Sequence, residues 1–150
     1  MSVTMADVRG ALDPDEVDYA FAAQLGSDAL PHLMTLVGGA DPGLAAKAAY
    51  LAGKIRGAES EAVVAAAAAS DDARVRVAAA SAASMLAPEA ASRVLTGLVL
   101  DADTGVQKLA LRSVPADASP NLRASIEQLS QAGPELAVRP MVTEALDRLV

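Results

Sequence analysis

The residues best suited to chemistry in this sequence are two closely spaced pairs of aspartates. Asp71 with Asp72 and Asp101 with Asp103 could exchange protons with a substrate or hold a divalent cation. Both pairs stand where helices are expected to begin. A carboxylate there caps free backbone N–H groups and meets the positive end of the helix dipole. We therefore expect these aspartates to cap helices.

The sequence offers few residues that could bind a metal ion or act as a nucleophile. His32 is the single histidine and there is no cysteine, so a zinc site lacks its usual ligands, and we expect His32 to be a partly buried packing residue. No Gly-x-Ser-x-Gly turn is present, and the glycine-rich stretch 38–43 lacks the Lys-Ser/Thr ending of a phosphate loop. The sequence predicts a protein that is not an enzyme and carries no cofactor or metal.

Composition and charge exclude further classes of protein. Hydrophobic residues fill 53% of the 150 positions, too many for a disordered chain. The net charge of −7 argues against nucleic acid as a partner, because that binding depends on clustered lysine and arginine. The apolar run 62–69 is far shorter than the roughly 20 residues of a membrane span. Since the first residues do not resemble a signal peptide, we expect a cytoplasmic protein without membrane contact.

Alanine, the strongest helix former, fills 36 positions and predicts an all-helical fold. The sequence also repeats with a period of 31 residues. Aspartates before one helix and apolar residues within the preceding helix share this spacing: Asp41, Asp72 and Asp103, and Leu33, Val64, Leu95 and Ile126. Two amphipathic helices per period are typical of a solenoid, in which each unit buries its apolar face against the next.

Capping residues, prolines and glycines place nine helices along the chain. The expected ranges are 14–25, 28–37, 42–56, 59–69, 72–86, 88–100, 104–114, 120–131 and 135–149. Pro140 should kink the last helix or make it begin near residue 140.

Both ends of a solenoid need a cover, because an open end would leave apolar surface in water. Val17, Phe21 and Leu25, spaced by four residues, are expected to cover the first unit, and Leu146 and Leu149 the last.

The segment from Asp41 to Ile55 resembles the second helix of a HEAT repeat of the short bacterial kind. It has an aspartate before a hydrophobic residue, then a basic residue, an alanine pair and an ending that resembles Leu-Gly-x-Ile. Residues 29–36 resemble the first helix of such a unit. The resemblance covers about residues 13–150 and implies a right-handed α-solenoid of about four to five HEAT-like helical hairpins. We expect residues 1–12 to be a flexible N-terminal segment and residues 13–150 to form a single HEAT-like repeat domain.

The resemblance also implies a surface for binding. Proteins of this family mainly hold other proteins, and the second helix of each unit lines the concave side. Outward positions on those helices form a set that we name the basic ridge: Lys47, Tyr50, Lys54, Arg76, Ser81, Met85, Lys108 and Arg112. Aromatic, methionine and arginine side chains are enriched at interfaces, and a cationic groove favours an acidic segment.

We expect a non-catalytic scaffold or adaptor that binds a protein or peptide along the basic ridge. Three alternatives remain open. The ridge bases could instead pair with aspartates of neighbouring units. The chain could be an accessory or lyase-like protein that holds a small molecule or cofactor for transfer, as some members of the HEAT-repeat family that it resembles do. Residues 1–28 carry six acids against one base. The chain could therefore also be an inhibitory, immunity-type protein that binds a cationic partner through its acidic segment 13–18.

Overall fold

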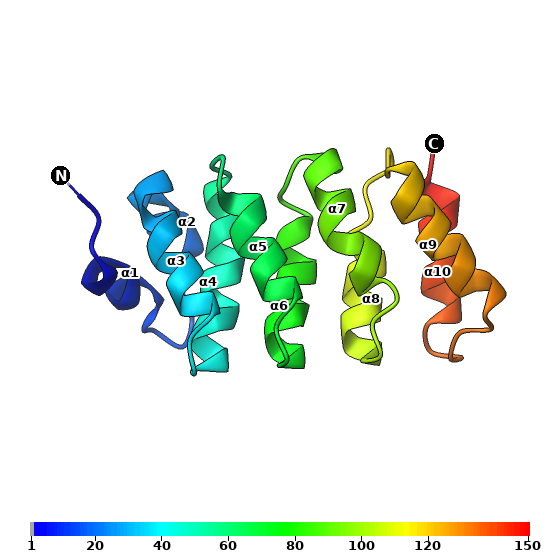
Figure 1. Cartoon of the computed structure of the whole chain (residues 1–150), viewed down its shortest axis with the longest axis horizontal. Helices are drawn as coiled ribbons and strands as arrows, with labels where there is room; N and C mark the ends of the chain where they lie inside the picture. The colour runs from blue at the N-terminus through cyan, green and yellow to red at the C-terminus, as the bar shows by residue number, and fades with distance from the viewer. Residues whose placement is uncertain (1) are drawn as a thin grey trace.

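The computed structural model describes residues 2–150, and within that range all regular structure is helical. The helices form two rows (Figure 1). The first row contains α3 (Leu30–Val37), α5 (Ser60–Ala68), α7 (Pro88–Leu98) and α9 (Pro120–Gln131); the second contains α4 (Pro42–Ile55), α6 (Ala73–Ala83), α8 (Thr104–Arg112) and α10 (Arg139–Arg148). Each helix contacts its partner in the same unit and the next helix of its own row. The predicted all-α solenoid of four to five hairpins is confirmed.

The aspartates before the second-row helices are caps, as predicted. The carboxylates of Asp41, Asp72 and Asp103 accept hydrogen bonds of 2.8–3.1 Å from backbone N–H groups in the first turns of α4, α6 and α8. Asp101 supports the last of these turns, because its carboxylate accepts the Asp103 N–H at 2.8 Å. The last helix, α10, begins beside Pro140, which also agrees with the prediction.

Small side chains let α4 and α6 approach closely. A Cβ atom placed on Gly53 of α4 would lie 2.9 Å from the carbonyl oxygen of Ala82 on α6 and 3.0 Å from the Ala82 Cβ. The alanines buried on these two helices are Ala45, Ala48, Ala49, Ala52, Ala79, Ala80, Ala82 and Ala83. Glycine is therefore required at position 53 by the distance between the two backbones.

The N-terminal segment differs from the expectation. Residues 5–12, expected to be flexible, form the helix α1 (Met5–Leu12), while residue 1 lies outside the described residues. Thr4 and Asp7 form a capping box, in which each side chain accepts the other's backbone N–H, at 2.9 and 3.1 Å. Val8 and Leu12 of α1 are fully buried. Helix α1 therefore covers the first unit of the solenoid.

Because α1 takes that place, the residues expected to cover the first unit do not all do so. The predicted helix 14–25 is reduced to the single turn α2 (Tyr19–Ala22) and a 3₁₀ turn, Ala23–Leu25. Val17 and Leu25 pack partly against the core, but the Phe21 side chain is 65% exposed. At the other end, Leu146 and Leu149 pack against the core as expected. None of the helices in residues 2–150 combines the length and apolar character that crossing a membrane requires.

We predict that Gly53→Ala destabilises the protein, although alanine is the better helix former. The added methyl group would overlap with Ala82, and overpacking of this kind costs about 1–3 kcal/mol, against a gain of about 1 kcal/mol in helix propensity. Gly97 on α7 is the control, because a Cβ there has no neighbour within 4 Å. Urea unfolding should show a lower midpoint for Gly53→Ala and a higher one for Gly97→Ala. A raised midpoint for both would disprove the close approach.

A second prediction concerns acid. Arg93 on α7 donates to both carboxylate oxygens of Glu61 on α5, at 2.7 and 2.8 Å, and this hydrogen bonding lowers the pKa of Glu61 below its ordinary 4.5. The pair therefore stabilises the fold above about pH 4.5, and the contribution is lost as the pH falls through the lower pKa of the folded state. Glu61→Gln should lower the unfolding free energy more at pH 7 than at pH 3. Glu127→Gln, at an exposed position without an ion pair in residues 2–150, should leave the pH profile unchanged.

Candidate partner-binding surface

Lys47, the first residue of the basic ridge, is engaged within the chain. Its Nζ donates hydrogen bonds to the carbonyl oxygens of Leu12, at 3.0 Å, and Pro14, at 2.9 Å. These acceptors lie at the end of α1 and just beyond it. Hydrogen bonds from a charged group are stronger than neutral ones. Lys47 therefore ties the N-terminal segment to α4.

Tyr50, one turn further along α4, holds the same segment. Its ring packs edge-to-face against Tyr19 at the start of α2, with 4.6 Å between ring centroids and an interplanar angle of 63°. Burial, with a smaller effect of Tyr50, raises the pKa of Tyr19. The segment between Leu12 and Tyr19 is thus fastened at both ends, by Lys47 and by Tyr50.

Arg76 of the ridge lies at the centre of a polar network between units. Its Nε and Nη2 donate to the carboxylate of Asp101, at 2.9 and 3.2 Å, and its Nη1 donates to the carbonyl oxygens of Ser70 and Asp71, both at 3.0 Å. The hydrogen bond to Asp101 raises the pKa of Arg76. One alternative from the sequence, pairing of ridge bases with aspartates of a neighbouring unit, is confirmed at this position.

The other ridge residues have no side-chain hydrogen bond or ion pair to any residue in the range 2–150. They are Lys54 on α4, Ser81 on α6, Met85 directly after α6, and Lys108 and Arg112 on α8. Lys54 and Arg112 are exposed, and the other three are half-buried. We name these five residues the open ridge. Because α4 contacts α6 and α6 contacts α8, the open ridge spans three neighbouring helices.

His32 has a structural role, in agreement with the prediction that it is a partly buried packing residue. Its Nε2 lies 2.9 Å from the carbonyl oxygen of Val3 and so connects α3 to the chain just before α1. Across residues 2–150 no group of three or more side chains could hold a metal ion. All buried side-chain nitrogen and oxygen atoms of that range have hydrogen-bond partners.

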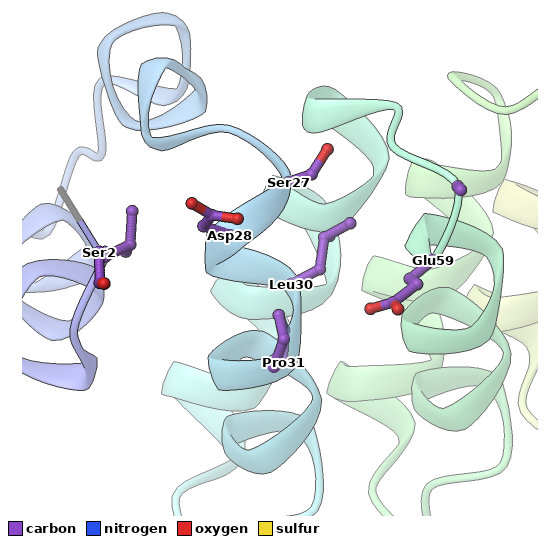
Figure 2. Close-up of a pocket in the computed structure, with 8 residues that line it drawn as sticks. Ser2, Ser27, Asp28, Leu30, Pro31 and Glu59 are labelled. Carbon is purple, nitrogen blue, oxygen red and sulfur yellow. The ribbon is translucent and has the colours of Figure 1, made fainter.

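A polar hollow of about 510 Å³ lies away from the basic ridge, between the N-terminal segment, the start of α3 and the α4–α5 connection. Figure 2 shows the side chains of Ser27 and Asp28 at the start of α3, with Ser2 on the N-terminal segment to one side and Glu59 beside α5 on the other. Two carboxylates and two hydroxyl groups come together, but there is no base and no third metal ligand. This hollow could not be predicted from the sequence, because its residues come from three separate segments.

No family model and no curated protein matches this chain. Among solved structures, the chain is similar to a chain from the complex of CpcE and CpcF of phycocyanin lyase from Nostoc sp. PCC7120, with a TM-score of 0.70 and 22% sequence identity. The similarity covers 94% of this chain and 96% of that chain. The two chains share one fold. It is a helical solenoid over almost the full length of both.

Replacing Lys47 tests its role in holding the N-terminal segment. Lys47→Met keeps a long side chain but removes both hydrogen bonds to residues 12 and 14. We expect amide hydrogen exchange in α1 to accelerate about tenfold or more, because α1 opens more often, while exchange in α6 stays unchanged. Lys54→Met, which removes an exposed lysine from the same helix, should change neither rate. If the amides of α1 in Lys47→Met exchange at the wild-type rate, the hydrogen bonds of Lys47 do not hold α1 in place.

Proposed function

We propose that this chain is an accessory protein of a lyase-like assembly, in which it binds a partner protein and helps to hold a small molecule for transfer. The observation that carries the proposal is the similarity of nearly the whole chain to one component of a phycocyanin lyase complex that contains two different proteins. Since both chains match almost from end to end, the proposal concerns the whole solenoid.

The geometry of the surface supports an accessory role. Several side chains that could act as acid or base serve instead as helix caps, ion pairs or packing residues, among them Asp72, Asp101 and His32. The hollows of the chain lie at its surface between neighbouring elements. A small molecule would therefore be enclosed only between this chain and its partner.

The open ridge is the surface that we assign to the partner. Lys54, Lys108 and Arg112 supply positive charge, and the methyl end of Met85 lies beside Gly53 at the junction of α4 and α6. Complementary charge accelerates association and selects the partner, while apolar contacts hold the complex once formed. This arrangement suits an acidic protein segment laid across α4, α6 and α8.

A simpler scaffold, which binds a protein along the open ridge without a small molecule, is the second candidate. The exposed side chains of Lys54 and Arg112 support the scaffold as well as they support the lyase-like function, because these side chains need only an acidic partner. The two functions differ in one observable property. The lyase-like function predicts that the chain, purified from its native cytoplasm together with its partner, contains a bound small molecule with its own absorption spectrum. A spectrum of protein alone would favour the scaffold.

The binding surface is tested by removing its charge. The triple variant Lys54→Gln, Lys108→Gln and Arg112→Gln should reduce recovery of the partner from native lysate about tenfold or more, measured by quantitative mass spectrometry. The control, Asn121→Asp with Gln128→Glu and Gln131→Glu, makes the same change in net charge at exposed positions of α9, in the other row. It should recover the partner as the wild type does. Full recovery by the triple variant would rule out the open ridge.

A further inference from the structure

An apolar pocket lies at the N-terminal end of the solenoid, between α1 and the α2 turn. Its volume is about 390 Å³, and its apolar wall consists of Gly10, Ala11, Phe21, Ala22 and Leu25, with Asp7 and Gln24 completing the lining. Phe21 is the single phenylalanine of the chain, and its side chain remains 65% exposed. An exposed aromatic ring beside an apolar pocket is typical of a surface that another molecule covers.

Gly10 is the second unusual feature of this pocket. It lies inside α1, where glycine stabilises a helix less than alanine does. A Cβ at this position would have no neighbour within 4 Å, so the packing of this chain does not require a glycine. This differs from Gly53, where the α6 backbone leaves no room. Close approach of another chain to α1 would explain the missing side chain.

The charge around the pocket identifies the kind of partner. Asp7 lines the pocket as a carboxylate, and hydrogen bonds from Thr4 lower its pKa below the ordinary value of 3.8. The Asp18 carboxylate accepts the Phe21 N–H at 3.0 Å. The exposed acids of the connection between α1 and α2 are Asp13, Asp15, Glu16 and Asp18. Within residues 1–28 six acids oppose Arg9, and Lys47 adds one positive charge where it binds Leu12 and Pro14, so this end of the solenoid remains net negative and attracts positive charge.

We propose that this pocket docks a basic segment of a partner protein. An apolar side chain of the segment enters between α1 and α2 and packs against the Phe21 ring, while neighbouring lysine or arginine side chains approach the surrounding acids. The flat surface at Gly10 lets the segment lie close to α1. This inference does not rest on the proposed function, because the pocket lies outside the open ridge and favours the opposite charge.

Two synthetic amphipathic peptides of equal length test the proposal, one built from leucine and lysine and the other from leucine and glutamate. Each is added to the full chain labelled with ¹⁵N, and binding is followed by amide chemical shifts. The lysine peptide should shift amides of α1 and residues 19–25 saturably. The effect should weaken as salt is added, because salt screens exposed charges. The glutamate peptide should not bind there.

Two pairs of variants show which side chains matter. Phe21→Ser and Gly10→Gln should each weaken binding of the lysine peptide about tenfold or more, since one removes the ring and the other places a side chain over the pocket. The matched controls are Leu136→Ser, at a leucine that is 76% exposed outside this pocket, and Gly97→Gln, at a helical glycine with equally open surroundings. The controls should bind within about twofold of the wild type.

Three results would overturn the proposal. Equal binding of both peptides at the pocket would show that charge does not select the occupant. Shifts centred on α6 and α8 would place the lysine peptide on another surface. Shifts of the same pocket amides that depend on protein concentration without peptide would identify a second copy of this chain as the occupant. None of these results bears on the partner of the open ridge, which is tested by its own variants.

Discussion

The close approach of α4 and α6 is the constraint on which the rest of the structure depends. Gly53 and the buried alanines bring the two backbones together, so that the second-row helices can follow one another along the solenoid. Side chains this small bury little apolar area per residue. Polar links between units therefore complement the core, such as Arg76 with Asp101 in the second row and Arg93 with Glu61 in the first. The same spacing presents the open ridge on three neighbouring helices.

The N-terminal end shows how covering a solenoid changes its surfaces. Helix α1 buries Val8 and Leu12 against the first unit and is connected to it by His32 at one end and Lys47 at the other. Lys47 and Tyr50 are thereby engaged, which leaves the open ridge to begin at Lys54. Phe21 is left at the outside of the cover, among acidic residues. One solenoid therefore has two surfaces of opposite charge, a basic one along the second row and an acidic one at its end.

Much of the fold could be predicted because its signals are local or periodic. The capping aspartates and Pro140 act within a few residues of their own position, and the 31-residue period repeats along the chain. The role of Lys47 and the hydrogen-bond partner of His32 could not be predicted, because the partners of both side chains are backbone carbonyls that lie 33–35 and 29 residues away and carry no side-chain signature. The cover of the first unit was predicted from Phe21 and Leu25, but the buried pair Val8 and Leu12 has the same spacing of four residues, and spacing alone does not show which pair is buried. Pairing of ridge bases with aspartates of a neighbouring unit was among the alternatives that the sequence left open, and Arg76 with Asp101 is such a pair.

The central claim is that the basic ridge is divided, with its first part engaged by the N-terminal segment and the rest open. The chain has three lysines, Lys47, Lys54 and Lys108, and all three belong to the ridge. Rates of acetylation by an amine-reactive reagent, measured for each lysine by mass spectrometry, test the claim directly. Lys54 should react fastest, Lys108 more slowly, and Lys47 about tenfold or more slower than Lys54, because its amine must first break two hydrogen bonds. Equal rates for Lys47 and Lys54 would contradict the account.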